Sequence, residues 1–409
     1  MGRLSMRILL VAVTVALTAC GATDTGGGGD GGAANASADG SKEIKIGATV
    51  ARTGPNSVIF PIFQSTSACF KRINDAGGIN GYTFDYVMSD DQYDPAKTVG
   101  AIRQLVDRDQ VFALVSSGGT ATNLAIKDYI AAKGIPNIGP QTGQPKAASP
   151  YTYLFIQDSV VEGAFQAKYA YDELGAKQLG IIYENDDVGK PFQEGAAHTA
   201  SERGEKLVKV PFQLGTRDLV PAVSKLKSAG ADAVIVSGVS SVPPPIIRAA
   251  DSIGYTPKWI AVAYALSPST IKELPTRQVD NMNLTFWATL PNADEAADMR
   301  DALAKYYPDV EPSPLTVMGW VPCTIFAAAF EEITAEGKAP DRDALREALD
   351  RFEDYSNDFI SGITYAPGDG VSEPHVPRPQ ELVATWKDGT LETVQPFSEA
   401  PKVPGQPGQ

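Results

Sequence analysis

The stretch from residue 73 to residue 123 constrains the fold most, because helix and strand signals alternate along it. A glycine pair at 77 and 78 marks the end of one helix, since glycine adopts positive φ without strain. Large side chains then alternate with small or polar ones over 82–88, which predicts a strand. Asp94 is placed to cap a second helix, and another strand at 111–115 runs into the polar loop SSGGTATN. This order of elements is the repeating unit of a parallel sheet covered by helices.

The same pattern continues on both sides of this stretch and recurs in a second half of the chain. In the first half, further strands are predicted at 44–50 and 135–138, and further helices at 61–75 and 123–133. In the second half, strands are predicted at 179–183, 206–211, 231–237 and 259–262. Helices are predicted between and before them, at 159–174, 191–203, 218–228 and 244–253. A length of 409 residues suits two domains. The sequence therefore predicts an α/β fold with two Rossmann-like lobes, each built on a parallel sheet.

The loops that follow the strands are the expected place for a binding site. In an open parallel sheet, ligands bind beyond the C-terminal ends of the strands, where the strand order reverses. If the first strand lies between the second and the third, the loops at 51–57 and 116–123 meet at that point. The loop at 140–145 should lie beside them. Two such lobes with facing loops form a cleft, which is a preferred location for small-molecule sites.

The composition argues against nucleic acid and metal as partners. The formal net charge is −14 and no block of Lys and Arg is present to neutralise phosphates. His198 and His375 lie far apart in the sequence. Helix capping and solvation explain Asp90, Asp91 and Asp94 better than a calcium site does. We therefore predict neither a metal ion nor a cofactor.

Common catalytic motifs are also missing from the sequence. The nucleophile motif G-x-S-x-G fails at Ser240, where valine stands in place of the second glycine. Neither G-x-x-x-x-G-K-[ST] nor G-x-G-x-x-G occurs. The loop SSGGTATN could hold a phosphate by its N–H groups, but it contains no basic residue. This pattern indicates binding rather than catalysis, and a hydrolase is the weakest of the alternatives.

The first 20 residues read as an export signal. Arg3 and Arg7 precede an apolar run at 8–17 that is too short to span a bilayer. The run ends in LTAC, which resembles the bacterial lipobox, whose cysteine (here Cys20) is lipidated and becomes the mature N-terminus. A plain secretory signal is the alternative. Residues 21–42 contain no apolar side chain larger than alanine, so we predict a flexible tether.

Two cysteines remain in the predicted folded region. In an exported protein, Cys69 and Cys323 are a plausible disulfide pair, provided that a helix at 61–75 packs on a helix at about 315–336. The alternative is two buried thiols that act as small apolar residues. At the other end of the chain, 396–409 is rich in proline and poor in apolar residues, so we predict disorder there.

Several motifs together resemble one protein family. They are EIKIGATVARTGPN, INDAGGINGYTFDYVMSDDQYDPAKTV, AAKGIPNIGP, YDELGAKQLGIIYENDDVGK and LVPAVSKLKSAGADAVIV. They are similar to the type I periplasmic binding proteins of the leucine/isoleucine/valine-binding family, with similar spacing from about 43 to 390. The resemblance implies two lobes that close on a solute about three crossover strands. By position, the crossovers fall near 155–158, 284–290 and 362–365, with lobe one at 43–156 and 290–361 and lobe two at 157–289 and 362–395.

The family's ligand-binding positions are only partly matched. Thr120 matches the hydroxyl residue that holds a ligand carboxylate, although an N-cap role would also explain it. Gln141 and Gly143 match a carbonyl and a threonine position, with Thr142 adjacent to the missing threonine. Val188 stands where the family has an aromatic residue, and Tyr264 stands near the position of the acidic partner of a ligand ammonium. The resemblance places ligand contacts at Asn56, Ser117, Gly118, Gly119, Thr120, Gln141, Thr142, Asp187, Val188, Val239 and Tyr264.

The missing acidic residue leaves two interpretations of the ligand open. A buried ammonium without an acidic partner is costly, so the ligand could be a carboxylate, an amide or a more apolar molecule. Alternatively, Asp186 or Asp187 supplies the charge and the ligand is an amino acid. The resemblance implies a monomeric receptor for an ABC importer, with permease and ATPase subunits as partners, anchored by lipid at the outer face of a bacterial membrane. A ligand sensor of a signalling system is the rival function.

Overall fold

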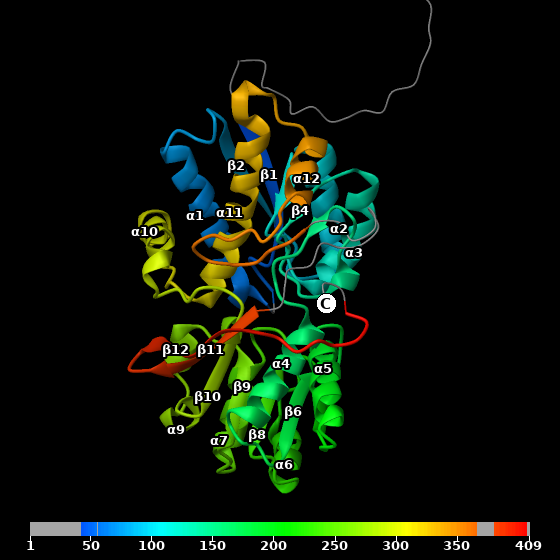
Figure 1. Ribbon diagram of the computed structural model, residues 1–409, viewed down its shortest axis with the longest axis vertical. Helices are drawn as coiled ribbons and strands as arrows, with labels where there is room; N and C mark the ends of the chain where they lie inside the picture. Colours follow the sequence, from blue (N-terminus) through cyan, green and yellow to red (C-terminus); the bar gives the residue numbers. More distant parts are fainter. Residues whose placement is uncertain (1–41, 55, 366–379, 407–409) are drawn as a thin grey trace, which may run out of the picture. The chain divides into compact units, whose positions relative to one another are not determined.

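The computed structural model describes residues 42–54, 56–365 and 380–406, which contain two sheets (Figure 1). The first sheet has the order β2-β1-β3-β4-β5, and all of its strands run parallel. Its strands are β1 (Glu43–Val50), β2 (Thr83–Asp90), β3 (Ala113–Val115), β4 (Asn137–Ile138) and β5 (Thr152–Tyr153). The first strand thus lies between the second and the third, which is the arrangement on which the predicted site depends.

Helices cover both faces of the first sheet (Figure 1). In β3, Ala113 and Val115 pack with α1 and α11, whereas Leu114 packs with α2 and α3 on the opposite face. This alternation follows from the period of two in a strand. The helices of this lobe are α1 (Phe60–Asp75), α2 (Pro95–Arg103), α3 (Thr120–Ala132), α10 (Ala297–Tyr306), α11 (Pro314–Thr334) and α12 (Arg342–Asp350). Asp94 caps α2 as predicted, with its Oδ1 2.8 Å from the Ala96 nitrogen.

The second sheet has the order β12-β11-β10-β9-β8-β6-β7. Five parallel strands carry an antiparallel hairpin at one edge, a common form of mixed sheet. The strands are β6 (Leu179–Glu184), β7 (Val208–Phe212), β8 (Ala233–Ser237), β9 (Lys258–Val262), β10 (Met282–Phe286), β11 (Gln380–Lys387) and β12 (Thr390–Glu399). One face packs on α4 (Ser159–Asp172) and α5 (Gly189–Glu202), and the other on α6 (Val220–Ser228) and α7 (Pro243–Ser252).

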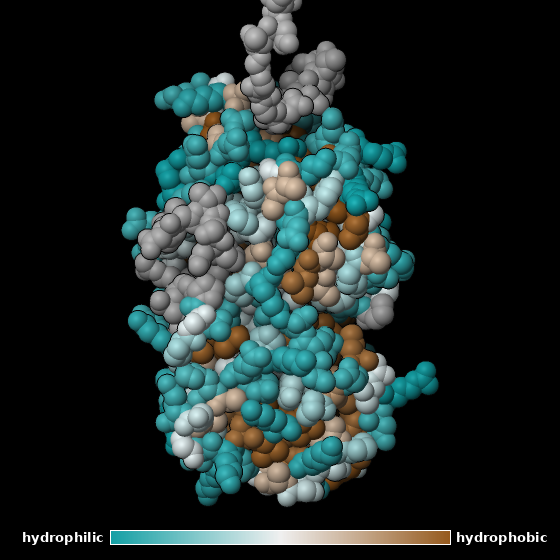
Figure 2. Space-filling view, turned by 90° about the vertical axis from the view of Figure 1, so that its right-hand side faces the viewer, coloured by the Kyte–Doolittle hydropathy of each residue, from teal (hydrophilic) through white to brown (hydrophobic). Residues whose placement is uncertain are grey.

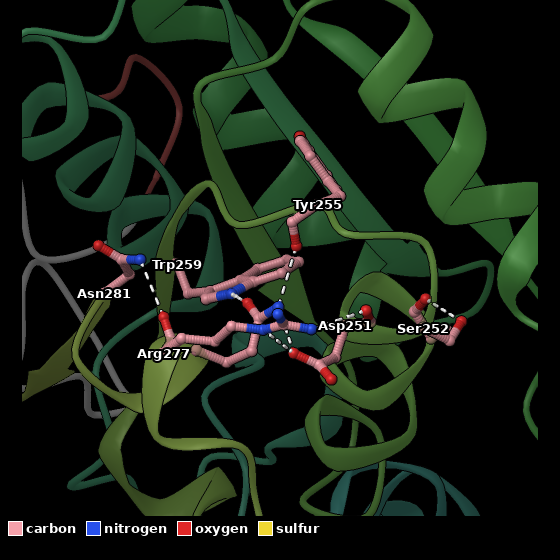
Figure 3. Close-up of polar contacts among 8 residues, drawn as sticks. Asp251, Ser252, Tyr255, Trp259, Arg277 and Asn281 are labelled. Atoms are coloured by element: carbon pink, nitrogen blue, oxygen red, sulfur yellow. Dashed lines mark hydrogen bonds and ion pairs between the residues drawn. The ribbon is translucent and has the colours of Figure 1, made fainter.

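A polar network holds the short helix α9 (Thr276–Val279) against the second sheet (Figure 3). Arg277 forms an ion pair with Asp251 at the end of α7, with 2.6 Å between Nε and Oδ1. The buried amide of Gln278 accepts a hydrogen bond from the Trp259 indole at 2.8 Å and donates one to the Tyr255 carbonyl at 3.0 Å. The indole N–H of Trp259 is therefore satisfied although its ring is buried in the core.

The chain crosses between the two lobes three times, and the crossing segments contact one another. The rings of Phe155 and Trp287 lie 4.9 Å apart, which joins the first crossing to the second. Thr289 donates its N–H to the Phe359 carbonyl at 2.8 Å, and the Tyr365 hydroxyl donates to the Leu154 carbonyl at 2.7 Å. This is the predicted two-lobed α/β fold with three crossovers. The limits of the lobes along the sequence stay a prediction.

Helices α1 and α11 pack closely and are joined by a disulfide between Cys69 and Cys323. At the crossing point, a Cβ on Gly319 would lie 1.8 Å from the Ile62 carbonyl oxygen, so only glycine fits there. The Thr66 hydroxyl bridges the same two helices by donating to the Gly319 carbonyl at 2.7 Å. Residues 314–337 are apolar enough for a membrane span, but 78% of their most apolar window is buried by the rest of the protein. They form the central core helix of the first lobe.

The prediction of disorder at 396–409 is wrong for residues 396 to 406. Strand β12 continues to Glu399, and Ala400 and Val403 are buried against α4. Prolines in an edge strand do not prevent pairing, because only one side of the strand forms the ladder. The signal segment with Cys20, the predicted tether, except for Lys42, and His375 lie outside the described residues.

The surface shown in Figure 2 is largely hydrophilic, with apolar residues in separate patches. Among the described residues, the large apolar side chains that are clearly exposed are Val58, Leu214, Val394 and Phe397. Scattered apolar residues of this kind are normal on a protein surface. They do not mark a docking site.

Candidate ligand-binding site

A cavity of about 80 Å³ is lined by residues from both lobes. It lies at the C-terminal ends of the parallel strands, where the loops after β1, β3 and β4 meet the loops after β6, β8 and β9. This is the predicted location for a ligand in sheets of this order. The lining residues are Asn56, Ile59, Ile62, Tyr93, Gly119, Thr120, Gln141, Thr142, Gly143, Ile156, Ser159, Val188, Phe192, Gly238, Val239, Ser240, Tyr264, Leu315 and Met318. The small space favours a small solute over an oligomeric one.

Most of the predicted ligand contacts line this cavity. From the first lobe they are Asn56, Gly119, Thr120, Gln141 and Thr142, and from the second lobe Val188, Val239 and Tyr264. The structure brings these eight residues together from six separate loops. Their contact with a ligand stays a prediction.

Three predicted contacts do not line the cavity. Ser117 is fully buried behind it, and its carbonyl accepts the N–H of Gln141 at 2.9 Å. Gly118 cannot offer its N–H to a ligand, because it donates to the Thr49 carbonyl at 2.8 Å. Asp187 is exposed and forms an ion pair with Lys146 of the first lobe, with 2.6 Å between Nζ and Oδ1. It therefore does not supply the charge for a ligand ammonium in this structure.

Two threonine hydroxyls of the cavity lining contact each other. Thr120 Oγ1 lies 2.9 Å from Thr142 Oγ1, and both side chains are buried. Thr142 Oγ1 also accepts the N–H of Gln144 at 3.1 Å. The N-cap of α3 is Gly119, and Thr120 is the first helical residue. The alternative role of Thr120 as an N-cap is therefore wrong, and its hydroxyl contacts Thr142 instead.

The amide of Gln141 is held in one orientation. Its Nε2 donates to Ser116 Oγ at 2.8 Å and lies within 3.4 Å of the carbonyl oxygens of Met318 and Gly139. Its Oε1 has no partner among the described residues, and neither has Oδ1 of Asn56. Because buried polar atoms are nearly always paired in folded proteins, two orphan oxygens beside one cavity need an explanation.

The remaining lining is mainly aliphatic and aromatic. Ile59, Ile62, Leu315 and Met318 project from α1, α11 and the turn before α1, and Phe192 projects from α5. The sequence analysis did not predict these residues as ligand contacts, because apolar residues at helical spacing usually belong to the hydrophobic core. Their side chains provide an apolar wall of the cavity.

The lining contains no acidic or basic side chain. One buried carboxyl lies behind the loop after β8, where Glu184 Oε2 accepts the N–H of Val239 at 3.1 Å. Burial, together with the neighbouring Asp186, raises the pKa of Glu184 to about 7. Asp186 accepts the N–H groups of Val188 and Gly189 on its Oδ1. Both carboxyls thus support the loops of the second lobe from outside the cavity.

The comparisons with known proteins agree with this geometry. The model of the periplasmic binding protein family matches residues 43–375. A protein from Pseudomonas aeruginosa named amino acid binding protein is 24% identical over 224 residues, which is 54% of this chain and 60% of that relative. The chain thus matches about 60% of the length of the first curated relatives.

Solved structures show the same fold over nearly the whole chain. A fatty acid ABC transporter substrate-binding protein from Thermomonospora curvata has a TM-score of 0.75 at 20% identity, covering 88% of this chain and 92% of its own. A branched-chain amino acid transporter substrate-binding protein from Streptococcus pneumoniae, in complex with isoleucine, has a TM-score of 0.73 at 20% identity. That match covers 87% of this chain and 100% of the other.

Proposed function

The chain belongs to the periplasmic binding protein family, and from this we propose that it is the extracytoplasmic substrate-binding component of an ABC importer. It holds a small solute in the cavity between its lobes and releases it unchanged. The observation that supports this most is the lining itself, which joins strand-end loops of both sheets around two buried threonine hydroxyls and an apolar wall. A nucleophile with an adjacent base, which turnover would require, is not among the lining residues.

The solute is of the size and polarity of an apolar amino acid or a related carboxylate or amide. Of the solved relatives named above, one is a fatty acid transporter protein and one is in complex with isoleucine. The aliphatic lining of this cavity accommodates a short branched chain. One polar end of the solute lies at Thr120 and Thr142, and its apolar end lies against Ile59, Ile62 and Leu315. Polar groups set among apolar ones are typical of a small-molecule site.

Binding works by closure of the two lobes about the three crossovers. The ligand first docks on the loops of the first lobe and then contacts Val188, Val239 and Tyr264 of the second. Because these contacts exist only in the closed form, the ligand shifts the population toward it. Permease and ATPase subunits then recognise the closed form. Lipidated Cys20 holds the receptor at the membrane, and two acyl chains suffice for stable anchoring.

Removal of the Thr120 hydroxyl should weaken ligand binding. We expect Thr120→Ala to raise the dissociation constant roughly fivefold to a hundredfold, since a buried hydrogen bond to a ligand is worth about 1 to 3 kcal/mol. Titration calorimetry with the solute that co-purifies with the protein, identified by mass spectrometry, measures this. Thr122→Ala is the matched control, because Thr122 lies one half-turn further along α3 and donates to Gly119 instead of lining the cavity. Equal affinities for both variants would contradict the proposed site.

The proposed function as a whole is tested by ligand-dependent stability and shape. A true ligand should raise the unfolding free energy as RT ln(1 + [L]/Kd), and solution scattering should show the lobes drawing together. Screening should cover apolar amino acids, the corresponding acids and the corresponding amides. A solute that the protein chemically converts, or the absence of any stabilising solute, would argue against a receptor.

A further inference from the structure

A proline inside α11 leaves one backbone carbonyl without its usual helical donor. Pro322 is buried in the interior of this 21-residue helix. Because proline has no N–H, the helical hydrogen bond from residue 322 to the carbonyl of Met318 is missing. Proline is also the least favourable residue for a helix interior. Its presence in the central core helix of the first lobe therefore needs a reason.

The carbonyl of Met318 is used instead by a side chain of the loop after β4. Gln141 Nε2 donates to this carbonyl at 3.3 Å, and it donates to Ser116 Oγ on the loop after β3 at 2.8 Å. Both Gln141 and Met318 belong to the cavity lining. An N–H at position 322 would compete with the Gln141 amide for the same carbonyl oxygen.

The ring of Pro322 also contacts the loop that carries Gln141. A Cβ on Gly139 would lie 2.5 Å from both Cβ and Cγ of Pro322, so a side chain does not fit between the loop and the helix. Gly139 also adopts a φ of +59°, which favours glycine. The helix and the loop are thus fitted to each other by the ring contact as well as by the amide of Gln141.

This loop contributes directly to the cavity. Its consecutive residues Gln141, Thr142 and Gly143 all belong to the lining. The Gln141 N–H donates to the Ser117 carbonyl at 2.9 Å, which joins the loop to the one after β3. A displacement of the loop would therefore move Thr142, whose Oγ1 lies 2.9 Å from that of Thr120.

We propose that Pro322 is a positioning residue for the ligand-binding site, an inference that rests on the proposed function. By withholding an N–H from Met318, it leaves that carbonyl to the Gln141 amide, which ties the loop after β4 to α11. Pro322 is not among the described residues that line the cavity, so its effect on a solute passes through Gln141. The helix loses a hydrogen bond, and the site gains a fixed loop, which is a common form of conflict between stability and function.

Pro322→Ala should loosen this loop without lowering the melting temperature. The restored N–H competes for the Met318 carbonyl, whereas alanine suits a helix interior better than proline does. We expect amide hydrogen exchange across residues 139–145 of the full-length, ligand-free protein to be at least about threefold faster. Pro245→Ala is the matched control, because Pro245 is exposed in the first turn of α7, where proline interrupts no helical bond. Unchanged exchange in Pro322→Ala, or the same increase in the control, would overturn the proposal.

Binding measurements test whether Pro322 acts through Gln141. Isoleucine, 3-methylpentanoate and 3-methylpentanamide share one branched tail, and the compound that the wild type binds most tightly serves as the probe. Pro322→Ala should raise its dissociation constant about three- to tenfold, the range of a single hydrogen bond. In a Gln141→Met background, Pro322→Ala should add no further loss.

Losses of affinity that add in the double variant would show that Pro322 does not act through Gln141, and they would overturn the proposal. A lower melting temperature of Pro322→Ala, together with such additive losses, would show that the proline serves the fold alone. If the wild type binds none of the three probes, the result counts against the proposed function. The exchange experiment, which needs no solute, then still decides whether Pro322 positions the loop.

Discussion

Replacement of Cys69 and Cys323 by alanine should lower the melting temperature by roughly 5 to 10 °C under oxidising conditions. The disulfide closes a loop with a sequence separation of 254 residues. In the chain-entropy model a loop of this size contributes about 5 kcal/mol, near the upper end of measured values. Each kilocalorie per mole shifts the midpoint of a large domain by about 2 °C. Differential scanning calorimetry with and without reductant measures the effect.

A double-mutant cycle separates the disulfide from the alternative of two buried thiols. If the bond is present, each single alanine variant removes it completely, and the double variant should lose little more than either single variant. If the two residues are independent thiols, the losses should add. The reduced wild type is the internal control and should melt close to the single variants. Additive losses, or a wild type indifferent to reductant, would contradict the bond between α1 and α11.

Most elements of the first sheet were predictable, because the residues that begin and end them favour the same boundaries that the packed structure has. Asp94 caps the start of α2, and the glycine pair at 77 and 78, which follows the end of α1, takes positive φ. Residue types that favour helix ends therefore mark these boundaries in the sequence. The hairpin of β11 and β12 was missed, although Asp388 and Gly389 carry its turn signal and both adopt positive φ. The proline content of the C-terminal region led to a prediction of disorder instead. Composition alone does not show whether a segment pairs with the edge of a sheet.

The site was predictable to the extent that the strand order places the loops. Thr120, Thr142 and Gln141 follow strands of a parallel sheet, so the topology alone brings them together. The apolar wall was not predictable in this way, since Ile62 and Leu315 are as buried as ordinary core residues and lie on helices. The ion pair between Asp187 and Lys146 joins the two lobes, and no local pattern in the sequence predicts such a contact.

The second large effect concerns two buried acids of the second lobe. Glu162 on α4 and Glu381 on β11 are fully buried. Glu162 Oε1 accepts the Thr285 hydroxyl at 3.0 Å, but its Oε2 and both oxygens of Glu381 have no partner among the described residues. Burial raises the pKa of Glu162 to about 8, with a smaller contribution from Asp158. Burial, and then the nearby Glu162, raise the pKa of Glu381 well above its ordinary value.

These raised pKa values make the folded protein less stable as the pH rises. In the unfolded chain a glutamate releases its proton near pH 4.3, whereas Glu162 in the folded protein keeps its proton until about pH 8. The folded state therefore binds more protons than the unfolded state across this window, and the unfolding free energy falls with increasing pH. We expect a loss on the order of 3 kcal/mol between pH 5 and pH 8, measured by urea unfolding at each pH.

Glu162→Gln together with Glu381→Gln should remove the part of this pH dependence that the two acids contribute. The glutamine amides are neutral at every pH, so the double variant should be more stable than the wild type at pH 8 and nearly equal to it at pH 5. Glu331→Gln is the control, because Glu331 is exposed on α11 and should leave the pH dependence unchanged. A wild type whose unfolding free energy stays level or increases from pH 5 to pH 8 would show that the two acids are ionised in the folded protein. In that case they would need a cation that neutralises them, since an uncompensated pair of buried charges is too costly to persist.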